Sequence, residues 1–163
     1  MDIAFLIVRL IVGLALMAHG LQKLLGWFGG HGLAGTGGFF ETLGFRPGKL
    51  FAPMAGLGET IGGLLTALGL CGALGPVLIV LVMLVAIGSV HYNKGFFVTS
   101  GGWELNAAYI AAAIAIAYGG NGAYSLDNAL NLSLLTDPVQ IAYAFAAAVV
   151  VATLTLLARR RAA

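Results

Sequence analysis

The sequence predicts an all-α, polytopic membrane protein: a compact bundle of transmembrane helices with almost no soluble domain. Of its 163 residues, 60% are hydrophobic and only 9% are charged, whereas soluble domains have about 25% charged residues. Five apolar segments approach the roughly 20 residues that a helix needs to cross a hydrocarbon core about 30 Å thick. These segments use most of the chain, so any chemistry must lie in the bundle, in its short loops or in another protein.

The first four apolar segments are expected to form a helical core. The segment at about residues 3–25 lacks basic residues before its apolar run and contains Arg9. A convincing cleavage site does not follow it, so we expect a retained helix and not a signal peptide. The other three helices are expected at about residues 50–70, 76–92 and 103–118.

Two segments between these helices are expected to lie outside the hydrocarbon core. Residues 26–38 are rich in glycine and are expected to form a loop. Residues 39–45 combine paired aromatic side chains with one carboxylate, which is typical of one or two amphipathic turns in the membrane interface. Residues 124–136 are expected to form a loop or a short surface helix.

A fifth helix is expected at residues 137–158, followed by a basic cytoplasmic tail at residues 159–163. Cytoplasmic loops of membrane proteins carry an excess of Lys and Arg. With five spans, the first loop, the third loop and the C-terminal tail share one side, and they hold Lys23, Arg46, Lys49, Lys94, Arg159, Arg160 and Arg161. This distribution predicts an outer N-terminus and a cytoplasmic C-terminus, whereas four spans would divide the basic residues between the two sides.

Glu59 is the most informative polar residue within the apolar segments. A charged side chain at the bilayer centre costs roughly 2.5–3.5 kcal/mol on insertion scales, so such residues usually face the bundle interior and have partners. At helical spacing its neighbours are small, namely Ala52, Ala55, Gly56, Gly62, Gly63 and Thr66. Because a stripe of small residues lets helices approach closely, we expect Glu59 in a helix–helix interface, near His19 or Lys23.

Polar residues of four helices are expected to gather in the cytoplasmic half of the bundle. His19, Gln22 and Lys23 are three and four residues apart, on one face of the first helix. His91 ends the third helix on that side, and the fourth helix begins there. The candidate ligand-binding residues are His19, Gln22, Lys23, Glu59, His91, Glu104 and Tyr109, and the candidates for a catalytic role are His19 and Glu59.

These candidates also have structural interpretations. Glu59 could be a carboxylate held by packing, and Tyr109 could belong to an aromatic belt at the membrane boundary. Arg9 could extend outward to the headgroups or pair with Asp2. Haem or metal ligation by His19 and His91 is disfavoured, because two histidines alone are more often hydrogen-bonded structural groups. The single cysteine and the lack of zinc-like Cys/His spacing favour no metal site.

Two motifs carry a resemblance to a known family. The first is Ala-His-Gly-Leu-Gln-Lys-Leu at residues 18–24, followed by Gly-Trp-Phe-Gly-Gly at residues 26–30. The second is Gly-Glu-x-x-Gly-Gly at residues 58–63. Over roughly residues 1–130, the chain resembles the DoxX family of small bacterial membrane proteins. The family pattern usually has four helices, so the fifth helix is a departure from it.

The resemblance implies a redox context in the bacterial cytoplasmic membrane. The family takes its name from a membrane subunit associated with quinone-linked oxidoreductases, so it implies redox-enzyme partner subunits and quinone as a ligand. It carries over His19, Gln22, Lys23 and Glu59 as the family's recurring polar positions. The leading hypothesis is a subunit of, or accessory protein to, such an oxidoreductase. The alternatives are a non-catalytic scaffold or assembly factor and a small transporter; a homo-oligomer stays open, and no nucleic-acid partner is expected.

Overall fold

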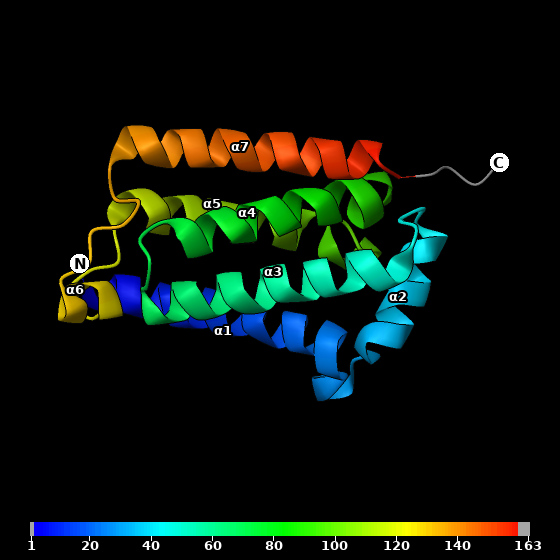
Figure 1. Ribbon diagram of the computed structural model, residues 1–163, viewed down its shortest axis with the longest axis horizontal. Coiled ribbons are helices and arrows are strands. Elements are labelled where there is room, and N and C mark those ends of the chain that lie inside the picture. Colours follow the sequence, from blue (N-terminus) through cyan, green and yellow to red (C-terminus); the bar gives the residue numbers. More distant parts are fainter. Residues whose placement is uncertain (1, 160–163) are drawn as a thin grey trace.

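A computed structural model describes residues 2–159 as a bundle of helices that run side by side in alternating directions (Figure 1). The long helices are α1 (Asp2–Leu25), α3 (Gly48–Leu68), α4 (Leu74–Ala86), α5 (Glu104–Gly119) and α7 (Pro138–Leu157). Two shorter helices, α2 (Gly32–Thr42) and α6 (Leu126–Leu130), lie at opposite ends of the bundle (Figure 1). The predicted all-helical membrane fold is confirmed.

Four segments of the described chain are long and apolar enough to cross a membrane: Asp2–Leu25, Gly48–Leu68, Leu74–Lys94 and Pro138–Leu157. The fifth, α5, is apolar but has only 16 residues, or about 24 Å at 1.5 Å per residue. It nevertheless packs within the bundle, against α4 and α1. The five predicted helices are therefore observed as four long segments and one shorter helix, α5, which the sequence predicted at residues 103–118.

The third predicted helix does not continue in α-helical form to residue 92. After Ala86 the backbone widens into a π-helical turn, η2 (Ile87–His91), and then tightens into a 3-10 turn, η3 (Tyr92–Lys94). Two further 3-10 turns, η1 (Trp27–Gly29) and η4 (Val98–Ser100), lie in the connections. A π-helical turn changes which side chains face a neighbouring helix, and such turns are frequent at functional sites.

The expectation of a loop at residues 26–38 is wrong for its second half, which forms most of α2. Glycine lowers helix propensity by about 1 kcal/mol per residue relative to alanine, but packing can outweigh propensity. Here α2 lies across the start of α3, and a Cβ atom on Gly48 would overlap the carbonyl oxygen of Gly37. Small residues thus permit a close contact between α2 and α3. This contact stabilises an 11-residue helix where the sequence predicted only one or two amphipathic turns.

The predicted interface of small residues is confirmed, and it serves two neighbours of α3. Toward α1, a Cβ atom on Gly13 would lie 2.5 Å from the Gly63 carbonyl oxygen, so the two backbones are in direct contact. Toward α4, a Cβ atom on Gly62 would lie 3.0 Å from the Leu78 Cβ atom. Glu59 precedes both contacts on α3 by about one helical turn and is only 6% exposed.

The structure corrects both expectations for Arg9, which is fully buried and neither extends to the surface nor pairs with Asp2. Its Nη2 donates a hydrogen bond of 2.5 Å to the Tyr124 carbonyl oxygen. Asp2 accepts a separate bond of 3.1 Å from the Ala123 amide. The loop before α6 folds over the start of α1, so it supplies an internal carbonyl acceptor that the sequence pattern did not reveal.

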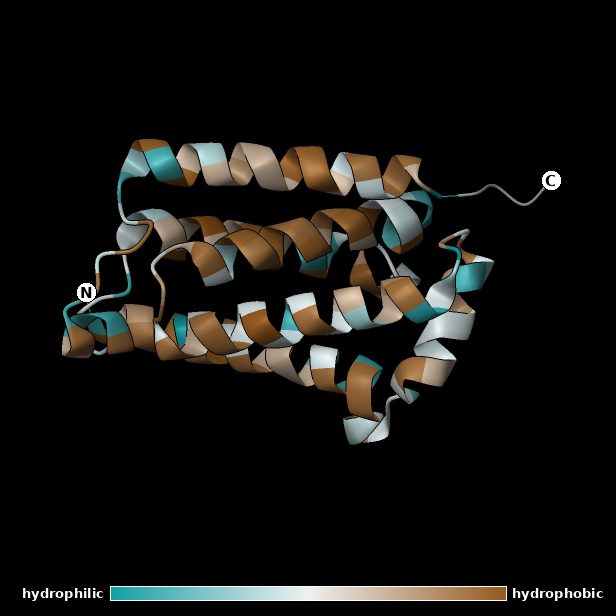
Figure 2. Cartoon of the chain, viewed as in Figure 1, coloured by the Kyte–Doolittle hydropathy of each residue, from teal (hydrophilic) through white to brown (hydrophobic). Residues whose placement is uncertain are grey.

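We call the two ends of the bundle the basic end and the Arg9 end. At the basic end, Lys23 lies in the last turn of α1, Lys94 ends the 3-10 turn η3, and Arg159 follows α7. Figure 1 shows that the C-terminal ends of α1 and α7 lie at the same end of the bundle. Figure 2 shows that hydrophobic residues dominate along the helices, while hydrophilic residues gather toward the ends. Of the predicted basic tail at residues 159–163, only Arg159 is within the described residues.

Candidate functional site

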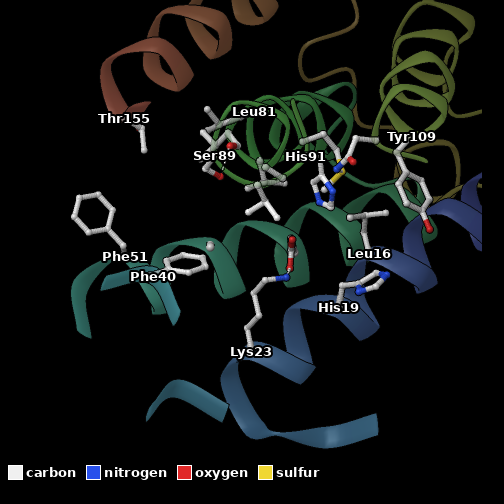
Figure 3. A pocket seen from close by; sticks show the side chains of 18 of the residues that line it. Leu16, His19, Lys23, Phe40, Phe51, Leu81, Ser89, His91, Tyr109 and Thr155 are labelled. Carbon is white, nitrogen blue, oxygen red and sulfur yellow. Dashed lines mark hydrogen bonds and ion pairs between the residues drawn. The ribbon is translucent and has the colours of Figure 1, made fainter. Parts of the chain in front are cut away.

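A cavity of about 430 Å³ lies in the basic half of the bundle, between α1, α3, α4, α5 and α7 (Figure 3). Its volume is within the range of small-molecule sites, about 300–1,000 Å³. Most of its wall is aliphatic or aromatic. The polar side chains that line it are His19, Lys23, Glu59, Ser89, His91, Asn106, Tyr109 and Thr155.

The centre of this cavity holds an ion pair between α1 and α3. Lys23 Nζ donates a hydrogen bond to Glu59 Oε2, with the lysine side chain 26% and the glutamate side chain 7% exposed. The pair is possible because Gly20 and Gly56 bring the two helices close, just N-terminal to each charged residue. The sequence left open whether Glu59 meets His19 or Lys23, and the structure shows Lys23.

Gln22 does not line the cavity, but it orients His19, which does. Gln22 Nε2 donates to the Phe28 carbonyl oxygen at 3.0 Å, so its amide oxygen faces the imidazole of His19 at 3.2 Å. An amide oxygen can only accept, so His19 Nδ1 carries the proton in this bond. In the neutral ring, Nε2 is then the atom that can accept a hydrogen bond.

His91 has the same protonated nitrogen, Nδ1, but its hydrogen-bond partner is a backbone carbonyl oxygen. Its Nδ1 lies 2.6 Å from the Gly101 carbonyl oxygen, which can only accept. Nδ1 is therefore the donor, and Nε2 of the neutral ring is an acceptor. His91 is the last residue of the π-helical turn, and Figure 3 shows its ring extending from α4 into the space between the helices.

Two further polar residues of the cavity come from α5. Tyr109 was predicted from the sequence and is half-buried in the cavity wall. Asn106 was not among the candidates, although it precedes Tyr109 by three residues and so shares its helix face. Asn106 is 8% exposed, and its Nδ2 donates weakly to Met83 Sδ at 3.4 Å.

Glu104 lies outside the cavity, whereas Tyr109, the other candidate on α5, lines it. Its Oε2 accepts a hydrogen bond of 2.9 Å from the Val98 amide, so it holds the loop before its own helix. Of the seven predicted ligand-binding residues, the cavity therefore brings together His19, Lys23, Glu59, His91 and Tyr109.

The other side of the cavity is an aromatic wall built by α2, α3 and the turn between them. Phe45 lies 5.8 Å from Phe40 and 5.2 Å from Phe51, measured between ring centroids. Both spacings are in the range of favourable aromatic pairs. This wall was not predicted, because Phe39 and Phe40 were expected to lie in the membrane interface.

A second cavity of about 280 Å³ lies at the Arg9 end, and the carboxylate that lines it, Asp127, is hydrogen-bonded to other parts of the protein. The Asp127 carboxylate accepts hydrogen bonds from the Cys71 amide at 2.8 Å, the Gly72 amide at 2.7 Å and Asn121 Nδ2 at 2.7 Å. A carboxylate with three donors is a structural tie between α6 and the turn that joins α3 to α4.

Comparison with known protein families identifies the family of this chain. The family model of DoxX matches residues 4–92, which is more than half of the chain. The chain belongs to the DoxX family. In this DoxX protein the match runs from α1 to the 3-10 turn after η2 and includes His19, Lys23, Glu59 and His91, whereas α5 and α7 lie beyond it.

No curated protein and no solved structure matches this DoxX protein significantly. The ion pair in the cavity joins Lys23 of the motif at residues 18–24 to Glu59 of the motif at residues 58–63. Among the described residues, no group of three His, Cys, Asp or Glu side chains is arranged to hold a metal ion.

Proposed function

We propose that this protein is a membrane subunit of, or an accessory protein to, a quinone-linked oxidoreductase, and that it binds a quinone or quinol in the cavity at the basic end. The observation that carries this proposal is the cavity itself. It combines a largely apolar wall with a half-buried lysine donor and two imidazoles whose Nε2 atoms can accept hydrogen bonds.

The residues present fit the chemistry of a quinone head. A quinone has a flat apolar ring and two carbonyl acceptors, and its reduced form has two hydroxyl donors. Lys23 has three N–H donors, and its bond to Glu59 uses one of them. The imidazoles of His19 and His91 can accept from hydroxyl groups, while the aromatic wall matches the ring.

When bound, a quinone supplies the coupling of two-electron transfer to the uptake of two protons. The chain itself would bind and orient the ring, and Glu59 would stabilise the positive charge of Lys23. Nε2 of each histidine would accept a hydrogen bond or a proton from the ligand, because Nδ1 is the atom that already carries a proton. Electrons would come from a partner redox subunit.

The orientation of the protein is part of the proposal. The basic ends of α1, α4 and α7 would face the cytoplasm of a bacterial inner membrane, in accordance with the positive-inside rule. The site would then lie in the cytoplasmic half of the bilayer, and protons would enter it from the cytoplasm.

The second candidate is a non-catalytic scaffold or assembly factor, and one observation favours it. Lys23 and Glu59 satisfy each other within the contact between α1 and α3. A purely structural role is sufficient to explain such an ion pair, because it can specify how two helices pack without taking part in any chemistry. Under this interpretation the cavity would be filled by lipid chains, and the protein would act through its partners.

Measuring quinone binding to the purified protein in detergent tests the proposal. The double variant Lys23→Met/Glu59→Gln removes both charges together, so no unpaired charge is left buried. We expect it to keep the fold and to bind a short-chain benzoquinone at least tenfold more weakly, because a hydrogen bond to a charged group contributes about 1.5–3 kcal/mol.

The matched control is Lys49→Met, since Lys49 is also at the basic end but is exposed and does not line the cavity. Its affinity should equal that of the wild type. If the wild type fails to bind the quinone yet still co-purifies with a redox enzyme, the scaffold interpretation replaces the proposal.

A further inference from the structure

The ligand cavity has two chemically different sides, and Figure 3 shows both. His19 and Tyr109 lie on one side of Lys23, whereas Phe40, Phe51 and Thr155 lie on the other. The first side offers hydrogen-bonding groups, and the second offers aromatic and aliphatic surface. A ligand that fills the whole cavity must therefore be polar at one end and apolar at the other.

The apolar side leads to the lateral surface of the bundle between α3 and α7. Helix α7 packs mainly on α4 and has little contact with α3. Met54 of α3 is 56% exposed and Val151 of α7 is 47% exposed, yet both also line the cavity. Side chains that are at once lining and exposed mark an opening of a cavity, so this cavity has a mouth between α3 and α7. Phe39, Val98 and Leu105 meet the same criterion, so the cavity wall is also open beside α2 and beside the start of α5.

Arg159 closes the basic side of this mouth. Its Nε donates to the Leu43 carbonyl oxygen at 2.9 Å, and its Nη1 donates to the Gly88 carbonyl oxygen at 3.2 Å. The guanidinium carbon also lies 5.5 Å from the centre of the Phe45 ring, a cation–π distance. The end of α7 is thereby tied both to the turn after α2 and to the π-helical turn of α4.

The mouth thus opens at the depth of the hydrocarbon core and not toward water. Val151 is seven residues before the C-cap Ala158, which places it about 10 Å from the end of α7 at 1.5 Å per residue. Phe51, Met54 and Val151 present only apolar surface there. A hydrocarbon chain is the group that can occupy such an opening without losing hydrogen bonds to water.

We infer that the cavity takes an amphiphile whose head lies beside Lys23, His19 and His91 and whose hydrocarbon tail passes between α3 and α7 into the bilayer. The inference rests on the proposed function and specifies its ligand as a tailed, lipid-soluble quinone that enters from the membrane. A water-soluble quinone would use only the head half of the cavity.

A pair of adjacent substitutions on α7 tests this path. Val151→Trp places a bulky side chain in the mouth, while Val150→Trp adds the same bulk to a neighbouring residue that is 57% exposed and does not line the cavity. Each variant is titrated in the same detergent with a decyl-tailed benzoquinone and with its tail-free parent. Comparing each variant with the wild type for one compound at a time cancels the partitioning of that compound into micelles.

We expect Val151→Trp to weaken binding of the tailed compound at least tenfold and that of the tail-free compound less than twofold, with Val150→Trp unchanged for both. Met54→Trp repeats the test from α3, and its control is Leu57→Trp, at an exposed residue outside the cavity wall. This second pair keeps the test valid if one variant misfolds.

The outcomes separate the two proposals. If both compounds bind the wild type and the mouth variants weaken neither, or weaken both equally, the quinone site stands and the lateral path is wrong. If neither compound binds the wild type, the proposed function fails, and the inference fails with it.

Discussion

The two ends of this bundle use polar residues in opposite ways. At the Arg9 end, polar side chains tie loops together: Arg9 holds the Tyr124 carbonyl, and Asp127 accepts from Cys71 and Gly72. At the basic end, the polar side chains of the helices line a cavity between them. The comparison teaches that a buried charge marks a candidate site only where the backbone does not already engage it, because loop carbonyls and amides engage Arg9 and Asp127 at the other end.

The largest expected effect is at the Arg9 end, with Asp127→Ala. The change leaves two backbone amides without their acceptor and removes the carboxylate that acts electrostatically on buried Arg9. We expect a loss of about 3–5 kcal/mol of stability, as for other disrupted buried charge networks. Denaturant-induced unfolding in detergent would measure it.

Asp137→Ala is the control for that loss. Asp137 is an exposed N-cap of α7 that also accepts from two backbone amides, so its removal should cost only about 1 kcal/mol. Equal losses for the two variants would show that the Arg9 end is an ordinary loop and not a tightly tied closure.

The next effect concerns the contact between α1 and α3 that joins the two ends. Gly13→Ala would place a methyl group 2.5 Å from the Gly63 carbonyl oxygen and 2.6 Å from the Ala67 nitrogen. The helices must separate, which should cost about 1–3 kcal/mol. Since the same two helices carry Lys23 and Glu59, quinone affinity should fall as well.

Gly38→Ala serves as its control, because a Cβ atom there has no neighbour within 4 Å. That variant should bind quinone as the wild type does, and its stability should equal the wild type or exceed it by up to about 1 kcal/mol, because alanine has the higher helix propensity. A Gly13 variant that loses stability yet binds quinone with wild-type affinity would separate the packing of α1 from the geometry of the cavity.

The smallest effect is expected for Glu104→Ala at the basic end. Glu104 holds the Val98 amide and does not line the cavity. Its loss should cost about 1 kcal/mol of stability and should leave quinone affinity within twofold of the wild type. A large loss of affinity in calorimetric titration would return Glu104 to the ligand-binding residues and extend the site to the loop before α5.

The sequence predicted much of the fold because apolar length and small-residue spacing are local properties of each helix. It also predicted that His19, Lys23, Glu59, His91 and Tyr109 share one half of the bundle, since depth along a helix follows from residue number. It failed for α2, whose glycines disfavour a helix locally but permit the close contact with α3 that stabilises it.

The sequence by itself determined the membrane fold, the basic end and the burial of Glu59, because each depends on the cost of placing polar groups in hydrocarbon. Only the tertiary structure decided the partners: Lys23 for Glu59 and the Tyr124 carbonyl for Arg9. It also decided the acceptors for Nδ1 of the two histidines in the cavity, which are the Gln22 side-chain amide oxygen for His19 and the Gly101 backbone carbonyl for His91. The partner that each side chain meets depends on the rotation of its helix about the helix axis and on which loop packs against that helix. Contacts between residues far apart in the sequence determine both.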